Sequence, residues 1–301
     1  DAREFSRGLW SKIDDRQGAP VWRGAGRALY FTVQERGSVH LYRQALDGAK
    51  AEKIVDGAVS VSSESVAKSG AMACALSTPG DMAELYVRGA GAGAGSGSGK
   101  QITELNKEVL AGQQVAEVEP FTFVSNDNKY QVEAFLVKPL GMTADSKHPL
   151  IVNIHGGPHG QNGPMFNFRD QAFAALGWAT LHVNYRGSTG YGQNFTDAIS
   201  GDWGGKPLED LQKGLAYVLE KYPFVDGKRA CALGASYGVY MIHWIAGNWN
   251  EPWKCLVSHD GNLDERMAYF DTEELWFPEW EHGGTPWENP ESYAKHNPID
   301  H

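Results

Sequence analysis

Hydrophobic and polar residues alternate in short runs over the first hundred residues, and glycine-containing turns separate the runs. One pair of runs, RGAGRALYFTV and VHLYRQALDG, flanks the turn ERGS within residues 23–48. A second pair, AKSGAMACALS and MAELYVRG, flanks the turn TPGD within residues 67–89. Alternation with a period of two residues is typical of half-buried β-strands, so each pair predicts an antiparallel hairpin.

The two predicted hairpins repeat with a spacing of 44 residues, which separates Gly26 from Gly70 and Leu41 from Leu85. A period of about 40–45 residues with this content indicates β-propeller blades. Two blades cannot close into a propeller, so we expect further blades upstream of this chain. A β-sandwich with similar hairpins is the alternative. The run GAGAGAGSGSGK at Gly89–Lys100 predicts a flexible hairpin loop.

The pattern changes near residue 118, where strands begin to alternate with helices. FTFVSNDNKYQVEAFLVKP predicts a strand pair, and further apolar runs predict buried strands: HPLIVNIHGG, WATLHVNYRGS, RACALGAS and WKCLVSHDG. Helical spacing occurs between them, in QAFAALG, LEDLQKGLAYVLEKY and VYMIHWIAGN. This alternation predicts an α/β domain with a parallel sheet covered on both faces. We therefore expect a partial β-propeller of about two blades at 1–118 and the α/β domain at 119–301.

Composition excludes several classes of function. The net charge of −10 argues against binding to a nucleic-acid backbone, which requires clustered Lys and Arg. No apolar run reaches the roughly 18 residues of a membrane span, and no hydrophobic signal segment precedes the first strand. We thus expect a soluble protein with no membrane partner. The sequence does not distinguish a periplasmic from a cytoplasmic location. The three cysteines, Cys74, Cys231 and Cys255, are expected to be buried free thiols that bind no metal.

The candidate chemistry begins at Gly234-Ala235-Ser236-Tyr237-Gly238, which fits the G-x-S-x-G nucleophile elbow. An apolar strand precedes it and a helical pattern follows, as the elbow requires. Small residues two positions before and after Ser236 let the backbone turn sharply and raise the hydroxyl above the sheet. Ser236 is therefore the predicted nucleophile; a structural turn serine is the alternative.

A second signal is His155-Gly156-Gly157-Pro158, which ends an earlier predicted strand. Acyl transfer needs backbone N–H donors for the oxyanion at such a position, and a second donor is expected from the residue after the nucleophile, Tyr237. A metal site formed by His155 and His159 is the competing interpretation. Gly-Gly-Pro between the two histidines cannot form the helix that this spacing would need, so we expect no metal.

Taken together, these motifs resemble the catalytic domain of the prolyl oligopeptidase family. The resemblance is carried by HGGPHGQNG, NYRGSTGYG at Asn184–Gly192, GDWGG at Gly201–Gly205 and GASYG. The run TEELWFPEWEHGGTPWENP at Thr272–Pro290 is more similar to the dipeptidyl peptidase 5 branch than to dipeptidyl peptidase 4. The resemblance implies an α/β-hydrolase domain covered by a propeller, and a serine peptidase that cleaves short peptides without a cofactor. The resemblance leaves open whether the protein forms homo-oligomers.

Carried over by position, the resemblance assigns Ser236 as nucleophile and the N–H groups of Gly157 and Tyr237 as the oxyanion hole. Tyr237 would also line the pocket for the side chain before the scissile bond. Aromatic residues after the next strand would form the far wall of that pocket: Phe270, Trp276 and Phe277. Plain core packing is the alternative role for each of these rings.

The sequence departs from the family's pattern in three places. Val239 replaces a glycine that usually follows the elbow, and His243 stands where a smaller polar residue is common. The family's triad Asp and His are expected beyond residue 301, so we expect this chain alone to be inactive and incomplete at both ends. Asp260, which ends the strand after the elbow, is expected to stabilise a loop.

Two other functions remain open at this point. One is a carboxylesterase or lipase on the same fold, and the other is a non-catalytic binding protein with a decayed site. The predicted blades and the GDWGG run argue against the esterase. Val239 and the absent triad partners are the only support for a decayed site.

Overall fold

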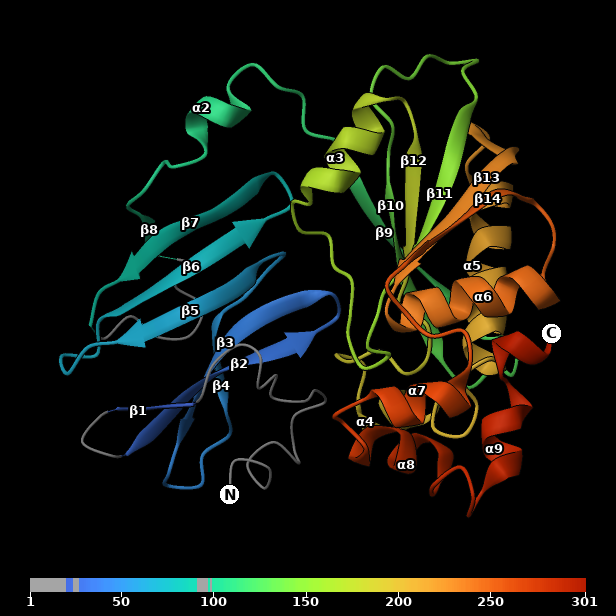
Figure 1. Cartoon of the computed structure of the whole chain (residues 1–301). Helices are drawn as coiled ribbons and strands as arrows, with labels where there is room; N and C mark the ends of the chain where they lie inside the picture. The colour runs from blue at the N-terminus through green and yellow to red at the C-terminus, as the bar shows by residue number, and fades with distance from the viewer. Residues whose placement is uncertain (1–19, 24–26, 91–96, 98) are drawn as a thin grey trace. The chain divides into compact units, whose positions relative to one another are not determined.

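The computed structural model describes residues 20–23, 27–90, 97 and 99–301 (Figure 1). The chain divides into two compact units, and the division falls between Glu117 and Val118, next to the predicted boundary. Segments Gly163–Gln171 and Thr189–Gln193 group with the first unit. Gly26 of the predicted repeat lies outside the described residues, as does most of the predicted glycine-rich loop.

Strands of the first unit form one eight-stranded sheet in the order β1-β2-β3-β5-β6-β7-β8, with β4 paired to β3. Their bounds are β1 Val21–Arg23, β2 Ala28–Glu35, β3 Ser38–Ala45, β4 Glu52–Val55, β5 Ser60–Val66, β6 Met72–Thr78, β7 Asp81–Arg88 and β8 Lys100–Gln101. The short helix α2, Lys107–Leu110, follows the last strand.

Both predicted hairpins are present, because β2 pairs with β3 and β6 pairs with β7, each antiparallel. The two hairpins of the repeat differ in how their equivalent residues pack. Leu41 is buried in a cluster with Val55, Val61 and Leu76, whereas Leu85 is 41% exposed. The strands β1, β4 and β5 were not predicted, and the assignment of this sheet to propeller blades stays a prediction.

The second unit contains a six-stranded sheet in the order β14-β13-β11-β12-β10-β9. Its strands are β9 Val118–Val124, β10 Gln131–Val137, β11 His148–Ile154, β12 Ala179–Val183, β13 Val225–Ala235 and β14 Trp253–His259. The helices along this part of the chain are α3 Phe168–Ala175, α4 Gln193–Asp197, α5 Lys206–Lys221, α6 Tyr237–Asn248, α7 Glu265–Asp271, α8 Trp276–His282 and α9 Pro290–Lys295, followed by the 3₁₀ turn η3 Pro298–Asp300. The first half of α3 and the first residue of α4 fall in the segments that group with the first unit. Within the described residues no helix is long and apolar enough to cross a membrane.

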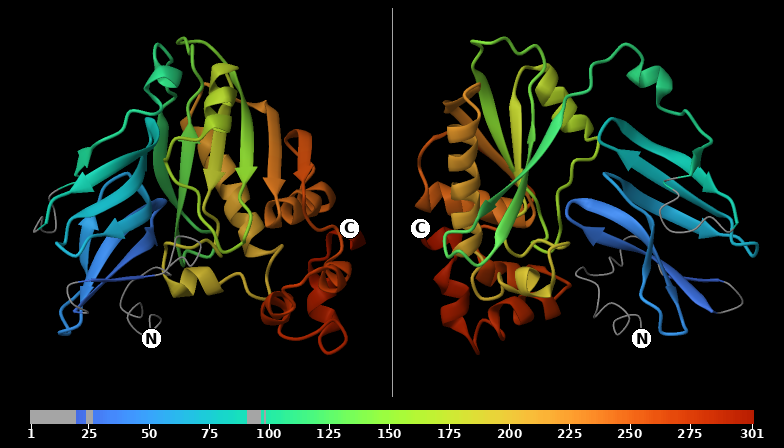
Figure 2. Two further views of the ribbon diagram at one scale, coloured as in Figure 1. Left: turned by 60° about the vertical axis from the view of Figure 1, so that its left-hand side comes forward. Right: turned by 180° about the vertical axis from the view of Figure 1, so that it is seen from behind.

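The sheet of the second unit is covered on both faces, by α3 on one side and by α5 and α6 on the other (Figures 1 and 2). Strands β11 to β14 are parallel neighbours as predicted, while β10 runs antiparallel to both β9 and β12. The antiparallel start follows from the short turn between β9 and β10, because only antiparallel strands can be joined by so few residues. The result is a mixed α/β sheet.

Register within this sheet positions the candidate site. Strands β11 and β13 are adjacent and parallel, and Ile154 pairs with Gly234 at their carboxyl ends. The HGGP run follows the first strand and the serine elbow follows the second. Parallel neighbours end at the same edge of a sheet, so the two motifs are brought together by backbone pairing alone.

The expectation of three free thiols is wrong. Cys231 of β13 and Cys255 of β14 form a disulfide, and Cys74 is the free cysteine. The two half-cystines are register partners on adjacent parallel strands. Sequence spacing could not reveal the pair, because β13 and β14 are separated in the chain by α6 and become neighbours only in the folded sheet.

A buried ion pair links the end of β12 to α5. The Arg186 side chain is 2% exposed and donates two hydrogen bonds to Asp210, of 2.8 and 2.7 Å. A third bond, of 2.9 Å, reaches Asp127 in the turn between β9 and β10. Three elements are therefore held by one guanidinium.

We predict that Arg186→Ala lowers the free energy of unfolding by about 3–5 kcal/mol, because the Asp210 carboxylate would stay buried without a cation. Denaturant unfolding measures the change. Arg229→Ala is the control, because the ion pair of Arg229 with Asp226 is exposed and its loss should cost less than about 1 kcal/mol. Equal losses in the two variants would contradict this prediction.

The disulfide makes a separate prediction about thiol reactivity. In denatured, unreduced protein we expect only Cys74 to react with a thiol reagent, and all three cysteines to react after reduction. Cys74→Ser should then show no reactive thiol before reduction. Three reactive thiols in the unreduced protein would restore the sequence-based expectation.

Candidate active site

Ser236 lies at the sharp turn between β13 and α6. Its backbone has φ 58° and ψ −124°, in a region that side-chain-bearing residues rarely adopt. The residue is exposed, and its hydroxyl has no hydrogen-bond partner among the described residues. The turn thus presents a free hydroxyl at the carboxyl edge of the sheet, as the sequence predicts for a nucleophile.

The two elbow glycines are required by close backbone approach. A Cβ on Gly234 would overlap the carbonyl group of Gly238, and a Cβ on Gly238 would overlap the carbonyl oxygen of Ile154 at the end of β11. The first contact closes the turn upon itself, and the second packs it against the neighbouring strand. Any larger residue at either position must displace backbone.

Asp260 and Gly261 hold the elbow from the other side. The Ser236 N–H donates to the Asp260 carbonyl oxygen at 2.7 Å, and Asp260 itself has a positive φ of 61°. A Cβ on Gly261 would lie 2.5 Å from both the Ser236 carbonyl oxygen and the Val239 Cβ. Asp260 therefore stabilises a loop through its backbone, and Val239 is accommodated because residue 261 has no side chain.

The glycine loop after β11 lies against the serine. An ideal Cβ on Gly156 would be 3.6 Å from Ser236 Oγ and 2.9 Å from the Ala235 carbonyl oxygen. Gly157 has a positive φ of 126°, which a side-chain-bearing residue would adopt only with strain. The predicted oxyanion loop and the predicted nucleophile are thus in contact, with glycine required at the approach.

Tyr237 contributes differently from what the resemblance implies for its side chain. Its ring is 3% exposed, and its hydroxyl donates to the Trp203 carbonyl oxygen at 2.7 Å. Burial raises the pKa of Tyr237 well above its ordinary value, so the phenol is neutral. Its backbone N–H, the first of α6, has no acceptor among the described residues. That N–H is an unpaired donor at a helix N-terminus.

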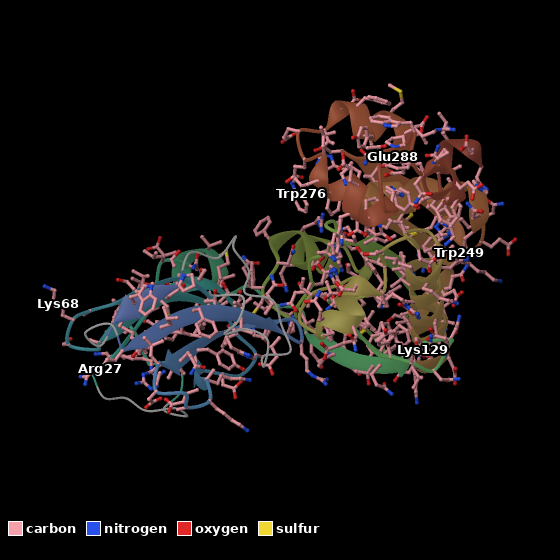
Figure 3. All side chains as sticks on the ribbon, turned by 90° about the horizontal axis from the view of Figure 1, so that it is seen from below. Arg27, Lys68, Lys129, Trp249, Trp276 and Glu288 are labelled. Carbon is pink, nitrogen blue, oxygen red and sulfur yellow. A yellow bond between two sulfur atoms is a disulfide. The ribbon has the colours of Figure 1, made fainter. Side chains whose placement is uncertain are left out.

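The aromatic residues named for the pocket do not form one cluster. Phe277 is half-buried, with its ring 6.4 Å from the His159 ring and 5.8 Å from the Trp203 ring. Trp276 is 66% exposed at the surface of α8, as Figure 3 shows. Phe270 is equally exposed and stacks on Trp287 instead.

His155 is not available as a base for Ser236. Its Nε2 lies 2.9 Å from Ser188 Oγ and its Nδ1 lies 2.8 Å from the Gly156 carbonyl oxygen. Burial lowers its pKa to about 4, so the imidazole is neutral near pH 7. All ten histidines belong to the described residues, and none of them is hydrogen-bonded to the Ser236 hydroxyl.

His159 instead binds a carboxylate. Its Nδ1 lies 3.0 Å from the Gly187 carbonyl oxygen, and its Nε2 lies 2.7 Å from Glu281 Oε1. The described part of the chain contains no group of three or more His, Cys, Asp or Glu side chains arranged to hold a metal ion.

Comparisons with known proteins bear on this geometry. Residues 164–301 match the model of the prolyl oligopeptidase family. Dipeptidyl-peptidase 5 of Schizosaccharomyces pombe is 41% identical over 174 residues, which are 57% of this chain and 26% of that protein. Dipeptidyl-peptidase 5 of Aspergillus oryzae is 40% identical over 179 residues, or 58% of this chain and 25% of that protein. This chain thus spans about a quarter of these relatives.

Solved structures give the same relationship. Acylaminoacyl peptidase of Pyrococcus horikoshii superimposes with a TM-score of 0.86 at 26% identity, covering 98% of this chain and 45% of that one. An acylaminoacyl peptidase in complex with Z-Gly-Gly-Phe-chloromethyl ketone gives 0.81 at 28% identity, covering 95% and 44%. The predicted relationship to the prolyl oligopeptidase family is confirmed. The α/β fold with mixed sheets is likewise similar to that of an acylaminoacyl peptidase.

Sequence reasoning missed Glu281 and the part that Trp203 and His159 take around it. Both Trp203 and His159 lie in quoted family motifs, yet nothing local distinguishes Glu281 among the 37 acidic residues of the chain. Its partners are 122 and 78 residues away. Glu281 lies in the quoted run Thr272–Pro290, directly after Trp280, and that position was the available signal, which is a weak one.

The elbow packing predicts that Gly234→Ala and Gly238→Ala each destabilise the protein by at least about 1–3 kcal/mol, because the new methyl group would displace backbone. Gly227→Ala, in the same strand β13, is the control, since its methyl group would meet only the end of the Leu219 side chain. Thermal unfolding compares the three variants. A Gly238→Ala protein as stable as Gly227→Ala would show that the elbow is looser than described.

Proposed function

We propose that the protein is a serine peptidase that hydrolyses short peptides through an acyl-enzyme on Ser236. The observation that carries the proposal is the exposed hydroxyl of Ser236, held on a strained turn against the glycine loop of the neighbouring strand. The named relatives are dipeptidyl and acylaminoacyl peptidases, which favours cleavage close to a peptide's N-terminus.

The chemistry follows from the site. Ser236 Oγ attacks the scissile carbonyl carbon while a general base takes the hydroxyl proton. The carbonyl π electrons move to oxygen, and the resulting oxyanion accepts hydrogen bonds from the N–H groups of Gly157 and Tyr237. Collapse expels the amine, which receives the proton from the same base. Water then repeats the sequence on the acyl-enzyme and releases the acid.

We infer that the base is supplied by a part of the protein outside these 301 residues. The Ser236 hydroxyl has no hydrogen-bond partner among the described residues, and His155 and His159 of the neighbouring glycine loop have other partners. A serine hydroxyl without an adjacent base is a weak nucleophile near neutral pH. The chain alone should therefore be inactive even though the elbow and the oxyanion loop are formed.

The substrate side chain before the scissile bond is proposed to be apolar or aromatic. Phe277 and Trp276 lie on α8, and Phe277 contacts the ring of His159 in the oxyanion loop. A related acylaminoacyl peptidase was solved with a chloromethyl ketone that ends in phenylalanine. An aromatic wall of this kind stabilises an apolar side chain by excluding water from both surfaces.

Three chromogenic substrates test the proposal in the full-length protein: a dipeptidyl-nitroanilide with a free N-terminus, its N-acylated analogue and a nitrophenyl ester. We expect nitroanilide hydrolysis, and Ser236→Ala should lower kcat by about 10⁶-fold. Ser258→Ala is the control, because its hydroxyl is bonded to His243. Ester hydrolysis without nitroanilide hydrolysis would instead indicate a carboxylesterase.

The separate proposal that this chain lacks a base is tested with a fluorophosphonate probe. The 301-residue chain should label at Ser236 far more slowly than the full-length protein, because the probe reports nucleophile activation. Circular dichroism and thermal unfolding control for folding. Equal labelling rates would refute the inference and would require a base within the chain.

A further inference from the structure

Glu281 connects two loops of the site through its two carboxylate oxygens. The side chain is in α8, and the residue is only 1% exposed. Oε1 lies 2.7 Å from His159 Nε2, and Oε2 accepts a hydrogen bond of 2.9 Å from Trp203 Nε1. The Glu281 carbonyl oxygen also accepts from the N–H of Gly201 at 2.9 Å. One residue therefore binds both the HGGPHG loop and the GDWGG loop.

The hydrogen-bond pattern determines where the protons lie. His159 Nδ1 must carry a proton, because its partner is the Gly187 carbonyl oxygen, which can only accept. A second proton then lies between His159 Nε2 and Glu281. Burial raises the pKa of Glu281, but the hydrogen bonds from His159 and Trp203 outweigh it and leave that pKa below its ordinary value.

The His159 end of the pair fixes the oxyanion loop. A Cβ on Gly157 would lie 2.5 Å from the His159 backbone nitrogen, so the two residues are tightly packed. The loop closes with a hydrogen bond of 2.9 Å from the Gly160 N–H to the Pro158 carbonyl oxygen. Both ring nitrogens of His159 bind groups outside this turn, so the ring anchors the turn. The position of the Gly157 N–H is fixed with it.

The other carboxylate oxygen acts on the second donor. Trp203 is bonded to Glu281 through its indole N–H, while its carbonyl oxygen accepts from the Tyr237 hydroxyl at 2.7 Å. The Trp203 and Tyr237 rings meet edge to face at 5.2 Å. Tyr237 is the first residue of α6, so this contact fixes the start of the helix and the direction of its free N–H.

We propose that Glu281 is a positioning residue that sets both oxyanion donors, through His159 for Gly157 and through Trp203 for Tyr237. The proposal rests on the proposed peptidase function. It assigns the Glu281 carboxylate a task beyond packing: each of its two oxygens binds one of the two loops, and the His159 ring joins Gly187 to α8.

The variant Glu281→Gln removes the negative charge of the side chain and keeps its size and shape. The glutamine amide can donate to a neutral His159 Nε2 and accept from Trp203, so both contacts persist while the charge is lost. Glu281→Ala removes both contacts. Glu279→Gln is the control on the same helix, because Glu279 binds the hydroxyl of Tyr269, outside the two loops.

The first measurement is nitrogen NMR of histidine-labelled full-length protein, with the His159 signals assigned by their loss in His159→Gln. We expect the His159 Nε2 signal to report a hydrogen bond in the wild type and in Glu279→Gln, and to lose that hydrogen bond in Glu281→Ala. A His159 Nε2 signal that is the same in the wild type and in Glu281→Ala would overturn the proposal, and this result does not depend on activity.

The second measurement is dipeptidyl-nitroanilide hydrolysis by the same proteins. Misplacing one oxyanion donor costs about 10²–10³ in kcat, so Glu281→Ala should lose at least that factor with KM little changed. Glu281→Gln should recover part of the loss, and Glu279→Gln should match the wild type. Thermal unfolding establishes that each variant is folded.

The failures of the two proposals are distinguishable. A wild-type protein that hydrolyses the substrate while folded Glu281→Ala keeps its full kcat would overturn the positioning role alone. A wild-type protein without hydrolysis would remove the proposed function and with it the positioning role of Glu281, whatever the nitrogen signals of His159.

Discussion

The structure of the site depends on one constraint, the backbone turn at Ser236. Strand β13 ends at Ala235 and α6 begins at Tyr237, so the chain turns at Ser236 alone, with φ 58°. The turn is possible because Gly238 packs on the Ile154 carbonyl oxygen and because Asp260 accepts the Ser236 N–H. These contacts come from β11 and β14, the two neighbours of β13. The parallel pairing of β11, β13 and β14 therefore stabilises the strained backbone conformation of Ser236.

Buried charges near the carboxyl edge of the sheet organise the loops around this turn. Arg186 joins β12 to Asp210 of α5, and Glu281 joins α8 to His159. Taking such groups out of water costs several kcal/mol per ion, so they are weak contributors to stability even when paired. Their geometry is nevertheless specific, because each has several directional partners. We interpret both as devices that fix loop positions, for which an apolar contact would be less selective.

How far the sequence could predict this depends on the distance over which each feature is determined. The two hairpins of the first unit, the strands of the second unit, the elbow and the two glycine motifs were predictable, because hydrophobic patterning and close approach are local properties. The disulfide between Cys231 and Cys255 was not, since it forms only when two strands become neighbours. Glu281 was missed for the same reason. The side chain of Tyr237 was placed in a pocket wall by resemblance, whereas its hydroxyl bonds to Trp203 and its ring is buried.

The departure at Val239 can now be weighed against the idea of a decayed site. A valine after the elbow would crowd the first turn of α6 if its surroundings were unchanged. Here Val239 is fully buried, and Gly261 leaves the space that its side chain occupies. A site losing its function has no reason to keep a positive φ at Ser236 together with a matched glycine beside the larger residue. Val239 and Gly261 are therefore better understood as a compensated pair that preserves the geometry of the elbow.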